Sequence, residues 1–362
     1  MSAMARTPTD PTPAVQIDFA NGLLGLAMME SDLGHKVRSV ARFAKIKRAG
    51  HWTILNNLSL FSGVGGLIQA DLLGHERSFF SPANLEHWIR IAIEMESRAD
   101  LISGLPGWAG ILSRLSERAS HEICKVRWLE RIESMIDNKI KFENEADLGL
   151  AHGWAGIAIS LAEFSSSGGL TRIPALRVLD KAFNHFEAIS GPLISKSKSW
   201  YWPSSAHREN GLWSSKTSAR ERQAWCYGSA GVQVARFKVG VAMDRPDLYE
   251  SAIQNFLLFA QADQEELLIV DPFICHGASG IALAARFFWN VTADVKAKKA
   301  WIRWKKIAEK MFEDLSQTSA AGLGILNGRD GYFYARDLPL ENRRGQGPEV
   351  LRFLQLSAID VR

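Results

Sequence analysis

The sequence is poor in cysteine, in net charge and in long apolar runs. Its three cysteines in 362 residues are too few, and odd in number, for a disulfide framework, so we expect a reducing cytoplasmic environment. A net charge of +4, from 43 basic and 39 acidic residues, argues against nucleic acid as a partner. No apolar run reaches the roughly 18 residues that a transmembrane helix needs.

The N-terminal stretch MSAMARTPTDPTPAVQ contains one arginine and no apolar core, so it does not look like a secretory signal. We expect residues 1–16 to form a flexible tail and residues 17–362 to form a single domain. The composition, with 46% hydrophobic and 23% charged residues, is that of an ordinary soluble globular protein.

A Gly-x-x-Gly motif recurs seven times along the chain, each time after a polar residue or tyrosine and usually before an apolar stretch. The copies are NGLLG (21–25), SGVGG (62–66), SGLPG (103–107), HGWAG (152–156), YGSAG (227–231), HGASG (276–280) and NGRDG (327–331). Most successive copies lie 41 to 51 residues apart. This period is the length of two helices with their connections, and it predicts a helical repeat.

The segments after the motifs fall into two kinds. Residues 156–164, 231–237 and 280–289 are apolar on most faces, as in helices buried on both sides. Residues 36–49 and 295–315 are amphipathic, as in helices that expose one face to solvent. The pattern predicts an all-α fold, an α/α toroid (double α-barrel) in which seven inner helices are ringed by seven outer ones. An open solenoid of the HEAT type has the same periodicity and remains the alternative.

Two repeat units differ from the others, one in its length and one in its motif sequence. A step of 75 residues between Gly153 and Gly228 leaves room for a long loop at about 192–220, rich in serine, tryptophan and basic residues. Such a loop suits a lid or a peptide-contacting surface, and it equally suits a solvent-exposed insertion. The seventh unit carries Arg329 and Asp330 where the others have small or apolar residues, so we expect its helix to be short.

Reactive side chains share one register of the repeat. Counted from the first glycine of each motif, Cys226 and Cys275 lie at position −2, His152 and His276 at −1, and Asp100 at −4. If the inner helices run parallel, these positions gather at one end of the ring, at the helix N-termini. The shared register therefore predicts a single functional site at this end of the ring, which we call its mouth.

Cys226, Cys275 and His276 form a set of ligand types that zinc prefers. Three protein ligands leave a fourth position for water or substrate, which is typical of a catalytic Zn²⁺ site. The partial positive charge of the helix N-termini, together with the metal, would keep the cysteines as thiolates. Cys124 has no such context, and we expect it to be an ordinary helix cysteine.

The chain resembles the lantibiotic (lanthipeptide) cyclase family, LanC, over about residues 20–331. The resemblance is carried by AWCYG (224–228) and CHG (275–277), with support from SLFSGVGG (59–66), DLISGLPG (100–107) and LAHGWAG (150–156). It implies a sevenfold double α-barrel with zinc held by the two cysteines and the histidine predicted above. It implies addition of cysteine thiols of a dehydrated ribosomal precursor peptide to dehydroalanine or dehydrobutyrine, which forms (methyl)lanthionine thioether rings.

The resemblance also assigns roles to residues around the metal. The histidine implicated in proton transfer falls on His152, the active-site aspartate on Asp100 and the family's arginine on Arg222. Two further residues, Trp225 and Tyr227, match the aromatics that flank the first cysteine, and the resemblance leads us to expect a catalytic role for both. Gln223 stands where some members carry an acidic residue, which puts a local contact in doubt.

The reactive types fit this chemistry. Zinc coordination deprotonates a substrate thiol, and its attack on the dehydro residue generates an enolate that needs charge stabilisation and then a proton. The resemblance further implies association with a dehydratase and an exporter at the membrane. Two other functions remain open: a LanC-like protein that joins glutathione or another thiol to dehydroamino acids, and a helical scaffold that binds peptides without chemistry or zinc.

Overall fold

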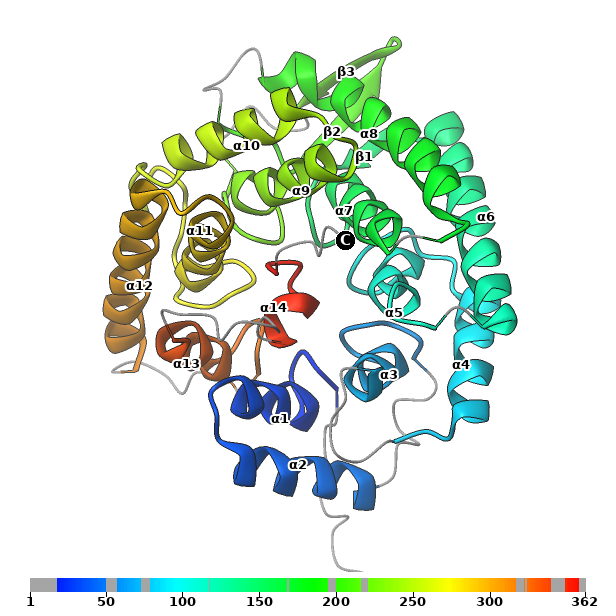
Figure 1. The fold of residues 1–362 in the computed structure, drawn as a ribbon. Coiled ribbons are helices and arrows are strands. Elements are labelled where there is room, and N and C mark those ends of the chain that lie inside the picture. The colour runs from blue at the N-terminus through cyan, green and yellow to red at the C-terminus, as the bar shows by residue number, and fades with distance from the viewer. Residues whose placement is uncertain are drawn as a thin grey trace, which may run out of the picture.

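A computed structural model describes residues 18–49, 57–72, 79–116, 118–167, 169–194, 200–215, 221–316, 322, 324–339 and 349–357. The expected tail at residues 1–16 lies outside these ranges. Two concentric layers of helices form a ring (Figure 1). The predicted all-α toroid is thereby confirmed.

Each of the seven motifs opens a helix of the inner layer. These are α1 (Leu23–Asp32), α3 (Val64–Leu72), the 3₁₀ helix η1 (Leu105–Trp108) with α5 (Ala109–Leu112), α7 (Trp154–Ser166), α9 (Ser229–Ala242), α11 (Ala278–Thr292) and α13 (Arg329–Asp337). The apolar faces of these helices are buried between the ring interior and the outer layer. Helix α13 has nine residues, so the short seventh helix predicted from its charged start is confirmed.

The outer layer contains six helices within the described ranges. They are α2 (Lys36–Ala49), α4 (Pro82–Met95), α6 (Ala119–Phe142), α8 (Arg172–Ile194), α10 (Pro246–Phe259) and α12 (Val295–Ser316). After α13 the chain does not supply a seventh outer helix among these residues. It continues instead into α14 (Glu349–Phe353), which lies inside the ring (Figure 1). The prediction of seven outer helices is wrong for the described chain, because the last segment packs inward.

A circle of backbone hydrogen bonds closes the ring just before the inner helices. At position −2 of every motif, the N–H donates to the carbonyl of the −2 residue in the next unit, over 2.9 to 3.5 Å. In order around the circle, these residues are Ala20, Phe61, Ile102, Ala151, Cys226, Cys275 and Leu326, whose N–H returns to Ala20. A circle of this kind leaves no free repeat end, so the open solenoid is excluded.

The second glycine of a motif is needed where consecutive units meet. A Cβ atom at Gly280 would lie 3.0 Å from Cβ of Trp225 and would collide with the carbonyl oxygen of Ile274. A Cβ atom at Gly231 would likewise lie 2.8 Å from Cβ of Leu150. The absence of a side chain thus allows each inner helix to approach the loop of the preceding unit.

The long insertion is partly a β-sheet. Helix α8 continues to Ile194, past the expected start of the loop, and contains Pro192. Strands β2 (Ser205–Glu209) and β3 (Leu212–Ser215) form a hairpin, and β2 also pairs with β1 (Glu145–Asp147). The sheet lies at the rim beside α8 (Figure 1). The prediction of a loop over 192–220 is therefore corrected for its described residues, since pairing with β1 orders the hairpin.

The C-terminal segment fills part of the ring interior. Four of its apolar side chains are buried, namely Val350, Leu351, Leu354 and Leu356. Two polar contacts attach it to α9 and the loop before it: indole Nε1 of Trp225 donates to the carbonyl of Leu354 at 3.0 Å, and Nζ of Lys238 to the side-chain oxygen of Gln355 at 3.4 Å. The interior is thus a packed core at this level.

Candidate metal centre

The circle of hydrogen bonds brings the two predicted cysteine ligands together. Cys226 lies in the loop before α9, and Cys275 and His276 lie in the loop before α11. The backbone N–H of Cys226 donates to the carbonyl of Cys275 at 3.2 Å. Cys226 and Cys275, which occupy the same position in neighbouring motifs, are therefore in direct contact although they lie 49 residues apart in the sequence.

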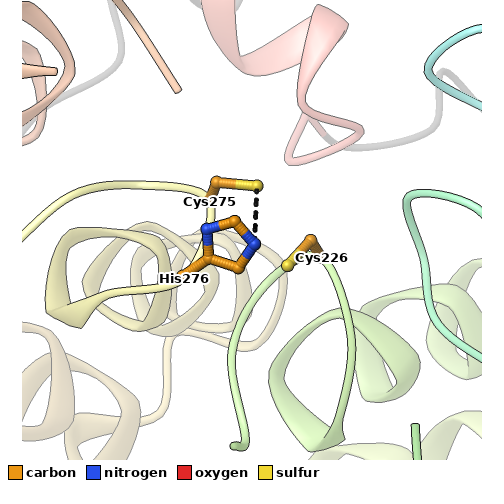
Figure 2. A group of neighbouring side chains, drawn as sticks. All are labelled: Cys226, Cys275 and His276. Carbon is orange, nitrogen blue, oxygen red and sulfur yellow. Dashed lines mark hydrogen bonds between the residues drawn. The ribbon is translucent and has the colours of Figure 1, made fainter. Parts of the chain in front are cut away.

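The three ligand atoms have the spacing of a small metal site. Sγ of Cys226, Sγ of Cys275 and a ring nitrogen of His276 all lie within 4.8 Å of one another. Nε2 of His276 is 3.8 Å from Sγ of Cys275 (Figure 2). Ligand atoms around a tetrahedral zinc ion lie roughly 3.6–3.8 Å apart, so the spacing and the ligand types of this set fit Zn²⁺.

The electrostatics of the two thiols differ. The hydrogen bond from Cys226 and the nearby His276 lower the pKa of the Cys275 thiol to about 6, against the opposing effect of burial. Burial, followed by the neighbouring Cys275, raises the pKa of the Cys226 thiol. The pKa of His276 is raised by its contact with Cys275. The pair thus favours one thiolate, and a dication would be needed to hold both.

Asn327 orients the histidine ligand. Its side-chain oxygen lies 3.2 Å from Nδ1 of His276. With the proton on Nδ1, the lone pair of Nε2 faces the sulfurs, which is the arrangement typical of a metal-bound histidine. Sequence reasoning missed Asn327, although it occupies position −1 of the seventh motif, the register of His152 and His276.

His152 and Asp100 form a second polar pair at the same mouth. Nδ1 of His152 is 3.4 Å from a carboxylate oxygen of Asp100, and the imidazole is about half exposed. The hydrogen bond with Asp100 raises the pKa of His152, and the negative charge of Cys275 acts in the same direction. His152 lies in the unit next to that of Cys226 and Asp100 lies in the unit before it, so the half-exposed imidazole adjoins the loop that carries the first thiol.

Arg222 connects the two loops that carry the ligands. Its Nη1 is 3.5 Å from a carboxylate oxygen of Asp271, in the loop of Cys275. The other oxygen of Asp271 accepts from the backbone N–H of Phe273 at 3.0 Å. Asp271 was not among the predicted site residues. The signal was its position −6, shared with Asp147 in the His152 unit and with Arg222 itself.

Comparison with known proteins identifies the family. A family model described as "Lanthionine synthetase C-like protein" matches residues 13–335. The chain belongs to the lanthionine synthetase C-like family. The "Nisin biosynthesis protein NisC" of Lactococcus lactis subsp. lactis is 23% identical over 364 residues, which cover 87% of this chain and 84% of that protein. A solved structure named "Nisin cyclase" matches with a TM-score of 0.71 and 20% identity, over 95% of this chain and 93% of that chain.

The aromatic residues of this family member's WCY stretch have different surroundings. The ring of Tyr227 lies 5.4 Å from that of His276, and burial raises the pKa of its hydroxyl. Trp225 is completely buried and donates to Leu354. The expected catalytic role of Trp225 is therefore corrected to a packing role, because its side chain has no access to a substrate.

Two other residues lie apart from the ligands. The side chain of Gln223 is buried and bonds the carbonyl of Trp202 and the N–H of Ser229, so it holds the loop before α9. Cys124 is buried in α6 of the outer layer, as expected for an ordinary helix cysteine. Within the described residues, no helix is long and apolar enough to cross a membrane.

Proposed function

We propose that this family member is a zinc-dependent cyclase that forms (methyl)lanthionine rings in a dehydrated ribosomal precursor peptide. In the reaction, a cysteine S–H adds across the double bond of dehydroalanine or dehydrobutyrine. The S–Cβ bond forms, the π electrons move to an enolate, and the α-carbon then takes a proton. Atoms balance without any co-reactant, so the product has the mass of the substrate.

Cys226, Cys275 and His276 are the residues that would hold Zn²⁺. A bound zinc ion with a free coordination position supplies activation of the substrate thiol by lowering its pKa. The two protein thiolates make such a site electron-rich, which preserves the nucleophilicity of a third sulfur. Asn327 would keep Nε2 of His276 directed at the ion.

The proton and the enolate need separate partners. His152, whose pKa is raised by Asp100, is the group we expect to deliver a proton to the α-carbon. Arg222, which is 30% exposed, offers positive charge for the enolate oxygen, and Asp271 orients its guanidinium. Tyr227 borders the site beside His276.

One observation carries this proposal. Two buried cysteines and the half-buried His276 form a group of metal-site dimensions beside the exposed imidazole of His152 and its partner Asp100, and both groups occupy the loops before parallel inner helices. Membership of the family and the name of the relative NisC support the same reaction. A packing role alone would require neither matching ligand types nor an exposed proton donor.

The test uses purified protein and a dehydrated precursor peptide that contains one dehydroalanine and one cysteine. We expect zinc at one equivalent per chain, loss of the free thiol to iodoacetamide labelling, and no change in peptide mass. Cys226→Ala should lose both zinc and cyclisation, whereas Cys124→Ala should keep both.

Three outcomes would contradict the proposal. Persistent alkylation of the peptide by iodoacetamide would exclude cyclisation. A gain of one glutathione mass, when glutathione is supplied, would instead support the thiol-joining alternative. Purified protein without zinc would support a non-catalytic peptide scaffold.

The remaining features of the proposal concern organisation and partners. We propose that residues 17–362 act as one catalytic domain in the cytoplasm. The precursor peptide is the expected substrate, and a dehydratase and an exporter are the expected partners in a biosynthetic complex. Co-purification of the tagged chain with each candidate protein tests these associations.

A further inference from the structure

A groove of about 600 Å³ opens between the loop 264–272 and the C-terminal end of α12. One wall contains Leu268, Val270 and Pro272, and the other contains Met311 and Leu315. Val270 is 71% exposed and Leu268 is 37% exposed. Apolar side chains of this size left open to solvent indicate a surface that gains stability when another molecule covers it.

The groove lies on the face of the ring that carries the metal centre. Helix α11 begins at that face, and the short connection between Thr292 and Val295 makes α12 run back beside it. The end of α12 is therefore level with the loops before the inner helices. The groove wall is attached there directly, because the carbonyl of Pro272 accepts from the N–H of Ser279 in the first turn of α11 at 3.3 Å.

The wall next to the metal ligands has a fixed shape. The backbone N–H of Ile269 donates to the carbonyl of Gln264 at 2.9 Å, and that of Leu268 donates to the carbonyl of Glu265 at 3.3 Å. Leu268 adopts a left-handed backbone conformation with φ of 54°. These two bonds are those of a helix-ending motif that usually has glycine at the left-handed position. A leucine there places a large apolar side chain at the groove despite its backbone cost.

The charge of the groove has one sign. Among its nine lining residues, Glu265 and Asp314 are acidic and none is basic. Both acidic residues are exposed, so they add negative potential at the edge of an apolar surface. A complementary occupant has leucine-, isoleucine- or valine-like side chains with lysine or arginine beside them.

We propose that this groove binds a cationic, apolar segment of the precursor peptide while another part of the same peptide reacts at the metal centre. The identity of the occupant rests on the proposed function, whereas the chemistry of the groove does not. Because Pro272 is three residues from Cys275, a peptide in the groove would emerge beside the ligands. The groove would hold the substrate by residues that do not react.

The experiment measures binding by fluorescence anisotropy with three fluorescein-labelled nine-residue peptides. One alternates lysine and leucine, one alternates glutamate and leucine, and one alternates lysine and serine. We expect the wild-type chain to bind the lysine–leucine peptide at least about tenfold more tightly than either of the others, since both charge and apolar area contribute.

Charge reversal provides the matched comparison. The double variant Glu265→Lys/Asp314→Lys should lose the lysine–leucine peptide and gain the glutamate–leucine peptide. The control Asp180→Lys/Glu250→Lys changes the same charge on exposed outer-layer positions and should bind like wild type. A second variant, Leu268→Ser/Val270→Ser, should weaken lysine–leucine binding and leave the circular dichroism spectrum and zinc content unchanged.

Several results would overturn the groove as the binding site. These are absence of lysine–leucine binding to the wild type, equal losses in the two charge-reversal variants, and equal binding of the lysine–serine peptide. The assay detects binding and not thioether formation. A chain that binds but does not cyclise therefore refutes the proposed function alone, and a chain that cyclises without using the groove refutes this inference alone.

Discussion

Nδ1 of His276 lies 3.2 Å from the side-chain oxygen of Asn327. The two residues share position −1 in consecutive motifs, 51 residues apart. The contact therefore repeats, at the level of side chains, the neighbour-to-neighbour bonding that the backbone makes at position −2. It leaves Nε2 on the side of the two sulfurs (Figure 2).

Removal of this contact should weaken metal binding. We expect Asn327→Ala to lower zinc affinity by about 10- to 100-fold, because the imidazole loses the partner that fixes its tautomer and ring orientation. Competition with a chromophoric chelator measures the affinity. Asn290→Ala, at an exposed position near the opposite end of α11, is the control and should keep the wild-type affinity. Equal affinity in both variants would contradict the role of Asn327.

A methyl group at the second motif glycine should destabilise the ring. Gly280→Ala forces a Cβ atom against the Ile274 carbonyl and Trp225, and we expect the free energy of unfolding to fall by about 1–3 kcal/mol or more. Gly191→Ala, within α8 and with open space where the added methyl would lie, should raise that free energy by about 0.5–1 kcal/mol. Urea titration followed by circular dichroism measures both. A neutral Gly280→Ala would refute the proposed close approach.

The C-terminal segment should contribute strongly to stability. Leu354 is completely buried inside the ring, and Leu354→Ala should lower the free energy of unfolding by about 2–5 kcal/mol. Leu212→Ala removes the same atoms from a side chain that is 75% exposed in β3 and should change stability by less than about 0.5 kcal/mol. Thermal unfolding of the two variants under one buffer compares them directly. Similar midpoints would show that the segment does not pack inside the ring.

The pH dependence of cyclisation should follow His152. Since its hydrogen bond with Asp100 raises the pKa of the imidazole, the protonated form persists to higher pH than in an isolated histidine. Asp100→Asn should move the alkaline decline of kcat/KM to lower pH, and the NMR titration of the His152 ring should move with it. Asp137→Asn, which removes a surface carboxylate of α6, should leave both curves in place. Coincident curves for the two variants would exclude His152 as the group that limits the rate.

Much of this molecule follows from the register of a short motif. The glycine spacing predicted the toroid, and equal position in the repeat predicted that Cys226, Cys275 and His276 would meet. The reason is physical, since parallel inner helices put equal positions at equal height and the backbone circle puts neighbours in contact. Asn327 was within reach of the same reasoning, but its amide is a weaker chemical signal than a thiol or an imidazole.

Other features depend on contacts that no local pattern reports. The β2–β3 hairpin is ordered by β1, which lies about sixty residues earlier in the chain. The sequence around Leu354 gave no prediction of its position, and only its packing against Trp225 shows that it lies inside the ring. For the same reason the burial of Trp225 could not be read from the AWCYG stretch.

The C-terminal segment that enters the ring fills part of its centre. Because Val350, Leu351, Leu354 and Leu356 pack inside, we expect a peptide that reacts at the metal centre to stay on the face of the ring that carries the ligands. We expect such a peptide to enter and leave by that same face. A bulky fusion at either end of such a polypeptide should therefore be tolerated, because neither end has to be threaded.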